Sequence, residues 1–239
     1  MTKLSFPQDR VDLTAALRWA DRLGLSEGID NHFSCAVEPD GRKFLVNPHG
    51  YHWREIRASD LVLADDTRKI LEGDNVVEDT AFFIHSRLHL RHPRAKAVLH
   101  THMPYATALT LTQGRALDTT LSQNAMRFHG RIGVDAHYAG LALDDSEGER
   151  IARGMDGADV AFLGNHGVIV CGARIDYAYD DLYYLERACM VEVLAASTGR
   201  PLVPVDAALA ARVADQTNGE RLQSELFFES LRRTLGARS

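Results

Sequence analysis

The chain of 239 residues has few cysteines, no long apolar run and no excess of positive charge. Its cysteines, Cys35, Cys171 and Cys189, lie far apart without a CxxC pair, which excludes a disulfide framework and a thiolate zinc site. The 27 Lys and Arg against 33 Asp and Glu give a net charge of −6, which argues against nucleic acid or a membrane surface as partner. No apolar run reaches the roughly 18 residues of a membrane span and the N-terminus lacks an apolar signal segment, so we expect a cytoplasmic protein.

Histidine, in contrast, is abundant, with 11 residues. Neutral imidazole is a common ligand of divalent transition metals, so many histidines without usable thiolates indicate a possible histidine metal site. The length and the hydrophobic content of 45% are those of an ordinary globular protein. Because we find no repeat, low-complexity tract or linker, we expect a single domain over residues 1–239.

The apolar periodicity predicts helices alternating with strands. We expect helices at about 9–23, 81–91, 104–112, 176–198 and 218–235, with Thr80 capping the second one. Strands are expected at 33–37, 43–47, 61–65 and 96–102, and on both sides of a tight turn at 164–167. This pattern predicts an α/β protein with helices on the faces of one sheet.

Two predicted strand ends carry histidines. His100 and His102 lie two residues apart on a strand, so both imidazoles point to the same face. His166 lies between glycines in a turn, where the backbone can approach a ligand closely. Each could instead be an exposed polar residue. Together, however, they provide three neutral nitrogen donors, a set that leaves coordination positions open for substrate or water.

Five stretches occur in a fixed order along the chain: Asn31-His32-Phe33-Ser34, Asn47-Pro48-His49-Gly50, His85, His100-Thr101-His102 with Pro104, and Leu163-Gly164-Asn165-His166-Gly167. This set resembles the class II aldolase/adducin family over residues 10 to 200. The resemblance implies a single three-layer αβα domain around a central, mainly antiparallel sheet, followed here by the helical segment 218–235. It also implies a homotetramer with active sites near subunit contacts. In that family three histidines hold a divalent metal, commonly zinc, which makes His100, His102 and His166 the expected ligands. Mn²⁺ and Fe²⁺ are alternatives.

The chain departs from the sugar-phosphate aldolases of that family at several positions. Their acid/base glutamate lies four residues before the match to His85, where this chain has Ala81. Their phosphate-binding serines match Asp79 and Thr80, and a Thr-Gly pair matches His49-Gly50. The carboxylate of Asp79, at the position of one of these serines, would repel a phosphate dianion. The departures therefore argue against a phosphorylated substrate and are closer to the adducin-like branch, which includes metal-dependent decarboxylases.

Another group must then transfer the proton. His32 and His49 are the first candidates, because imidazole titrates near neutral pH, although His32 could instead order its loop. Glu78 and Asp79 are weaker candidates, since carboxylates before a helix are also favoured by the helix dipole. We expect Asn31, Gly50 and Thr80 to contact the substrate.

Several other residues receive structural interpretations. We expect Tyr138 in the core rather than as a proton donor, and His92 on the surface. His85 and His89 lack the glutamate of an HExxH motif, so no separate metal site is expected there. Phe227-Phe228 could either cross to a neighbouring subunit or cover its own sheet.

The leading interpretation is a divalent-metal-dependent carbon–carbon lyase that acts on a small non-phosphorylated carboxylate or hydroxy-keto compound through a metal-stabilised enolate. A decarboxylase is slightly favoured over an aldolase, because departing carbon dioxide itself leaves the carbanion and only one proton is needed. The alternative is an adducin-like, non-catalytic binding or scaffold domain that retains the metal site.

Overall fold

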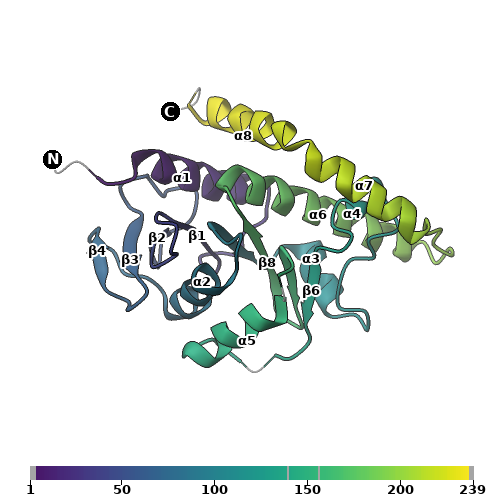
Figure 1. Ribbon diagram of the computed structural model, residues 1–239, viewed down its shortest axis with the longest axis horizontal. Coiled ribbons are helices and arrows are strands. Elements are labelled where there is room, and N and C mark those ends of the chain that lie inside the picture. Colours follow the sequence, from purple (N-terminus) through teal and green to yellow (C-terminus); the bar gives the residue numbers. More distant parts are fainter. Residues whose placement is uncertain (1–3, 139, 156, 237–239) are drawn as a thin grey trace.

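The computed structural model describes residues 4–138, 140–155 and 157–236. One sheet of eight strands runs through these ranges in the order β4-β3-β2-β1-β5-β8-β7-β6 (Figure 1). The strands are β1 His32–Ala36, β2 Lys43–Val46, β3 Val62–Asp65, β4 Ile70–Glu72, β5 Ala97–Thr101, β6 Ile132–Asp135, β7 Val160–Leu163 and β8 Gly167–Gly172. Neighbouring strands are antiparallel except for β6 and β7, which are parallel. The predicted α/β fold with a mainly antiparallel central sheet is confirmed.

Helices cover both faces of this sheet (Figure 1). On one face lie α1 Pro7–Arg22, α3 Pro104–Thr110, α6 Ile175–Ser197 and α8 Arg221–Gly236, with α4 Gln123–Met126 beside α6 and α7 Ala207–Gly219 against α4. On the other face lie α2 Asp79–Arg91 and α5 Asp145–Met155. None of the helices in the described ranges is long and apolar enough to cross a membrane.

Strand β5 is buried on both faces, and its side chains alternate between the two helix layers. Ala97 and Leu99 pack into the core under α1 and α6, whereas Val98 packs into the core under α2 and α5. Because the side-chain period of a strand is two, His100 points to the same face as Val98. The end of β5 therefore presents His100 on the α2 and α5 side of the sheet.

The C-terminal segment covers its own chain. Phe228 is buried and its ring lies 5.7 Å from that of Tyr179 in α6. The indole N–H of Trp19 in α1 donates to the carbonyl of Leu231 at 2.9 Å. Phe227-Phe228 could either cross to a neighbouring subunit or cover its own chain, and in the structure α8 covers its own chain by packing on α1 and α6.

Five elements were not predicted: β4, α4, β6, α5 and α7. The sequence of α5 contains two glycines and many charges, and only Ile151 and Met155 form its buried apolar stripe. Helix α7 is rich in alanine, which gives little hydrophobic periodicity. The predicted cap of α2 was wrong: Glu78, rather than Thr80, is the N-cap and accepts from the amide of Ala81.

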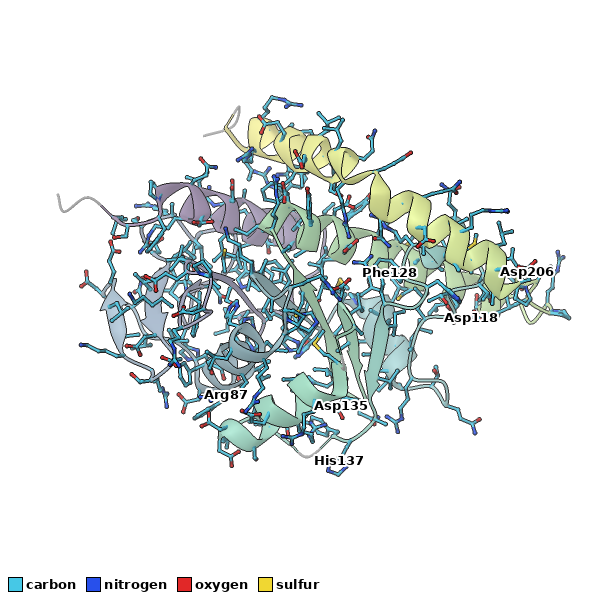
Figure 2. All side chains as sticks on the ribbon, viewed as in Figure 1. Arg87, Asp118, Phe128, Asp135, His137 and Asp206 are labelled. Atoms are coloured by element: carbon cyan, nitrogen blue, oxygen red, sulfur yellow. The ribbon has the colours of Figure 1, made fainter. Side chains whose placement is uncertain are left out.

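Helices α2 and α5 pack closely because of a glycine. A Cβ atom at Gly148 of α5 would overlap the backbone carbonyl of Phe83 in α2. Arg87 of α2 reaches across the same interface to Asp145, with 3.2 Å between Nη2 and Oδ1 (Figure 2). This contact positions α5, which contributes Glu147 and Ile151 to the cavity described below.

We expect Gly148→Ala to lower the free energy of unfolding by about 1–3 kcal/mol, because the added methyl group has no space against a backbone atom. Gly154→Ala in the same helix is the matched control, since a Cβ there meets its nearest atom at an ordinary 3.5 Å. Alanine forms helix better than glycine, so this control should gain up to about 1 kcal/mol. Urea unfolding measures both; equal stability of the two variants would contradict the close packing.

Candidate functional site

Three histidines from two chain segments meet at the end of β5. His100 is the fourth residue of β5 and His102 follows the strand directly, and their Nε2 atoms lie 3.2 Å apart. His166 lies in the turn between β7 and β8, with its ring centroid 4.8 Å from each of the other two. One potential ligand atom of each residue lies within 4.8 Å of those of the others. The structure thus brings together the three histidines that the sequence predicts as ligands.

The turn before β8 must lie very close to the end of β5 for His166 to reach His100 and His102. A Cβ atom at Gly167 would lie 2.8 Å from Cδ2 of the His102 ring and would also crowd the carbonyl of Thr101. Asn165 adopts a left-handed conformation with φ of 59°, which turns the chain between the strands. Glycine at 167 therefore allows His166 to approach the other two histidines.

Hydrogen bonds fix the tautomers of His100 and His102. Nδ1 of His100 lies 3.0 Å from the carbonyl oxygen of Val168, and Nδ1 of His102 lies 2.7 Å from a carboxylate oxygen of Glu27. Both oxygens only accept, so both Nδ1 atoms donate, and in neutral rings both Nε2 atoms carry lone pairs. Two bare Nε2 nitrogens 3.2 Å apart repel each other unless a metal ion or a proton is shared between them. This donor set therefore fits a divalent metal ion.

Burial keeps the imidazoles of His32, His100 and His166 neutral. Burial first, and neighbouring histidines second, lower the pKa of His166 from 6.5 to about 4 and that of His32 to about 3. Burial also lowers the pKa of His100 well below 6.5. Neutral imidazole is the form that binds metals, so these rings are already in the ligand form near neutral pH.

The three histidines face a cavity of about 350 Å³. The residues around it are Ile29, Asp30, His32, His49, Glu78, Thr80, Ile84, His100, His102, Tyr138, Gly140, Leu141, Ala142, Glu147, Ile151 and His166. Three of these side chains are carboxylates, whereas none of the described lining residues is Lys or Arg. The cavity has room for a small molecule and offers no cationic side chain to a phosphate group.

Four of the predicted catalytic and substrate-contacting residues line the cavity, and they come from β1, the loop after β2 and the start of α2. His32, His49 and Thr80 line the cavity, and Glu78 lies beside Thr80, whose hydroxyl donates to it. Asp79 does not line the cavity: it is exposed and forms an ion pair with Arg68. Successive helical residues point about 100° apart, so the residue after the cap faces away from the cavity. At this helix end the carboxylate in the cavity is thus Glu78.

Asn31 and Gly50 do not line the cavity either. The side-chain oxygen of Asn31 accepts from the amides of Glu27 at 2.7 Å and His102 at 3.5 Å. Asn31 thereby connects the loop that carries Glu27 to the end of β5. Gly50 is exposed with φ of 82°, a turn position next to His49.

Two expectations about other residues were wrong. Tyr138 is not in the core: its side chain is half exposed, lines the cavity and has its ring centroid 5.9 Å from that of His166. His92 is not on the surface: it is buried and donates from Nε2 to the carbonyl of Ala158 at 2.9 Å. In both cases the position depends on contacts with distant parts of the chain, which local sequence patterns do not report.

Sequence reasoning also missed Glu27 and Glu147. Glu27 lies in a loop 75 residues before its partner His102, so no local spacing connects them. Glu147 lies on α5, the helix that the periodicity did not reveal, and is paired with Arg150. A carboxylate near a ligand histidine is a common partner, but only the fold identifies which one it is.

Behind the cavity, His32 belongs to a buried group of polar side chains from β1 and α2. Its Nδ1 lies 2.6 Å from Nε2 of His85, and Ser34 lies between His85 and His89. His85 and His89 are therefore members of this hydrogen-bonded group. Among the described residues, neither belongs to a cluster of three potential metal ligands.

A helix-covered antiparallel sheet with three histidines facing a cavity is the architecture of a candidate metal-dependent enzyme. The family described as Class II Aldolase and Adducin N-terminal domain matches residues 11–193, more than half of the chain. The chain therefore belongs to the class II aldolase and adducin family, as its motifs indicate.

Relatives in this family carry different names. A protein of Pseudomonas aeruginosa named as an aldolase class 2 protein is 32% identical over 213 residues, 89% of this chain and 81% of that protein. Decarboxylase NovR of Streptomyces niveus is 30% identical over 78% of this chain and 69% of its own length. An adducin-related protein of Schizosaccharomyces pombe is 31% identical over 79% of this chain, but only 59% of that protein is covered.

The fold agrees with a solved structure over the whole chain. An aldolase II superfamily protein from Pseudomonas syringae superposes with a TM-score of 0.90 at 31% identity. The superposition covers 100% of this chain and 96% of the other.

We expect the metal-free protein to lose stability as the pH falls from 6.5 towards 4. Burial lowers the pKa of His89 from 6.5 to about 4, so in this range the unfolded chain takes up a proton that folded His89 does not. The free energy of unfolding then falls with pH, by up to about 1.4 kcal/mol per pH unit for one histidine. Urea unfolding at several pH values should show a smaller slope in His89→Phe, because the contribution of one histidine is removed. Equal slopes in the two proteins would contradict this account.

Proposed function

We propose that the protein is a divalent-metal-dependent carbon–carbon lyase, a decarboxylase or aldolase, acting on a small non-phosphorylated carboxylate or hydroxy-keto compound. The observation that carries the proposal is the pair of Nε2 atoms 3.2 Å apart, both with Nδ1 already donating, beside His166 and a cavity. A site of this kind leaves positions open for a substrate.

His100, His102 and His166 would hold the metal, with Glu27 supporting His102. We favour zinc, since three neutral nitrogens with an open position are typical of its catalytic sites, with Mn²⁺ and Fe²⁺ as alternatives. A bound divalent ion supplies a Lewis acid for a substrate oxygen on which negative charge develops.

The cavity supports the substrate class. Asp30, Glu78 and Glu147 contribute negative charge, and the described lining has no Lys or Arg to balance a phosphate dianion. The name of the NovR relative supports a decarboxylase over a sugar-phosphate aldolase. A substrate with a single carboxylate or with neutral oxygens meets less repulsion here than a phosphate ester does.

Proton transfer falls to His32, with His49 as the second group. Both line the cavity, but His32 is buried, whereas His49 is exposed and can exchange protons with solvent. Ala81, at the position of the family's acid/base glutamate, is buried and packs against the core formed with Phe44. Thr80 is retained as a substrate contact.

The test combines metal binding with turnover. We expect the full chain with added Zn²⁺ or Mn²⁺ to release carbon dioxide or a carbonyl product from a member of a panel of hydroxy- and keto-acids. Glu27→Ala should weaken metal binding roughly 10–100-fold, as loss of an outer hydrogen-bond partner does, and His166→Ala should weaken it more and abolish turnover. Elemental analysis and metal titration measure binding.

His137→Ala is the matched control, because His137 is exposed and points away from the body of the protein (Figure 2). Unchanged metal content in His166→Ala would overturn the metal site. Intact metal binding without turnover across the panel would overturn the lyase and favour the adducin-like scaffold domain.

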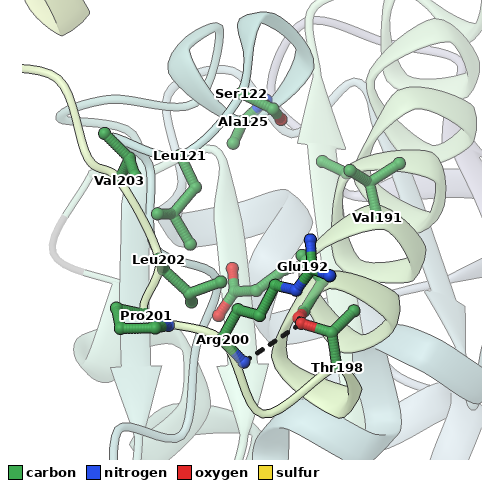
Figure 3. A pocket seen from close by; sticks show the side chains of 12 residues that line it. Leu121, Ser122, Ala125, Val191, Glu192, Thr198, Arg200, Pro201, Leu202 and Val203 are labelled. Atoms are coloured by element: carbon green, nitrogen blue, oxygen red, sulfur yellow. Dashed lines mark hydrogen bonds between the residues drawn. The ribbon is translucent and has the colours of Figure 1, made fainter.

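We also propose that the chain forms a homotetramer, as many class II aldolases form oligomers. A groove between the end of α6 and the following segment, lined by apolar side chains together with Glu192 and Arg200, supports a subunit contact there (Figure 3). Val203 is 85% exposed and Leu202 and Val191 are each more than a third exposed, so a subunit contact here would remove apolar surface from water.

Light scattering on the full chain should give four times the chain mass of 26.5 kDa. Val203→Asp should shift the mass towards smaller species, because a charge in a buried contact is unfavourable. A mass of one chain at micromolar concentration would contradict the tetramer.

A further inference from the structure

A chain of buried hydrogen bonds leads from the cavity to the backbone. Nδ1 of His32 lies 2.6 Å from Nε2 of His85, and Nδ1 of His85 contacts the hydroxyl of Ser34. The same hydroxyl lies 2.7 Å from Nε2 of His89, whose Nδ1 lies 2.6 Å from the carbonyl oxygen of Ala95. All four side chains are buried.

The carbonyl at the end sets the direction of every bond in the chain. A carbonyl oxygen only accepts, so Nδ1 of His89 must donate to Ala95. His89 is neutral because burial lowers its pKa to about 4, and its Nε2 therefore carries a lone pair. That lone pair accepts the one proton of the Ser34 hydroxyl.

The remaining two bonds follow from the first two. Ser34 has donated its only proton, so its oxygen accepts from Nδ1–H of His85. His85 is also neutral, since burial lowers its pKa well below 6.5, and its Nε2 accepts from Nδ1–H of His32. In neutral His32 the proton is then on Nδ1, and Nε2 is bare.

We propose that Ser34, His85 and His89 are positioning residues that hold His32 as the Nδ1–H tautomer, with an unprotonated Nε2 available to the cavity. Among the described residues Nε2 of His32 has no hydrogen-bond partner, which leaves it free for a ligand. The use of this lone pair rests on the proposed function: Nε2 accepts a proton from a substrate hydroxyl or a water, and His32 acts as a base.

The same geometry excludes proton exit through the back of the site. The reverse polarity would leave a bare Nδ1 of His89 facing the Ala95 carbonyl, two acceptors 2.6 Å apart. An amide carbonyl also cannot take the proton onward. A proton accepted at Nε2 of His32 therefore returns to the cavity, to the substrate or to water.

The tautomer is measured directly in the metal-free full chain at neutral pH. Histidine ring ¹⁵N chemical shifts distinguish a protonated nitrogen from a bare one, and His32→Gln identifies the His32 signals by their loss. We expect a protonated Nδ1 and a bare Nε2 in the wild type. In Ser34→Ala, which is nearly isosteric, the His32 Nε2 signal should move towards the protonated position, and Ser34→Thr should restore it.

Two results would overturn the proposal: a protonated Nε2 in wild-type His32, or an unchanged His32 spectrum in folded Ser34→Ala. If Ser34→Ala does not fold, His89→Phe interrupts the chain at its far end and gives the same readout. Neither spectrum depends on turnover. A silent substrate panel with the expected shifts would thus reject the lyase and leave the tautomer assignment intact.

Discussion

The pairing of β1 with β5 is the constraint on which the rest of the site depends. Its register places His32 opposite His100 and Ser34 opposite Val98. A slip of one residue would turn His32 and Ser34 to the other face of the sheet, away from α2. The position of His32 beside His100 and the hydrogen-bonded group behind them are therefore fixed by one set of backbone hydrogen bonds, buried between two helix layers.

The electrostatics of this region follow from that burial. Many imidazoles lie close together in a poorly solvated region, where several positive charges would repel each other and lose hydration. The imidazoles are instead neutral, and each needs a donor and an acceptor for its two nitrogens. Carbonyls of Val168 and Ala95 supply two acceptors, and the bare nitrogens left over point to one place, the cavity.

The sequence was informative where function depends on local spacing. The alternation of His100 and His102 along a strand and the glycines around His166 predicted residues that the fold brings together. It was uninformative where the choice depends on tertiary packing: Glu27, the exposure of Tyr138, and which of Glu78 and Asp79 faces the cavity. Which of Glu78 and Asp79 faces the cavity depends on the exact residue at which α2 begins, and neither composition nor periodicity predicts that residue.

Helix α2 brings two residues of different chemistry to the same side of the site. Ala81 and His85 lie about one turn apart on α2, so they face the same side of the helix. Ala81 fills core space without a titratable group, whereas His85 reaches β1 and binds His32. Through His85, the helix orients the imidazole of His32 on the neighbouring strand. Because that imidazole is held by a carbonyl-terminated chain of hydrogen bonds, the fold selects which nitrogen of the neutral ring carries the proton.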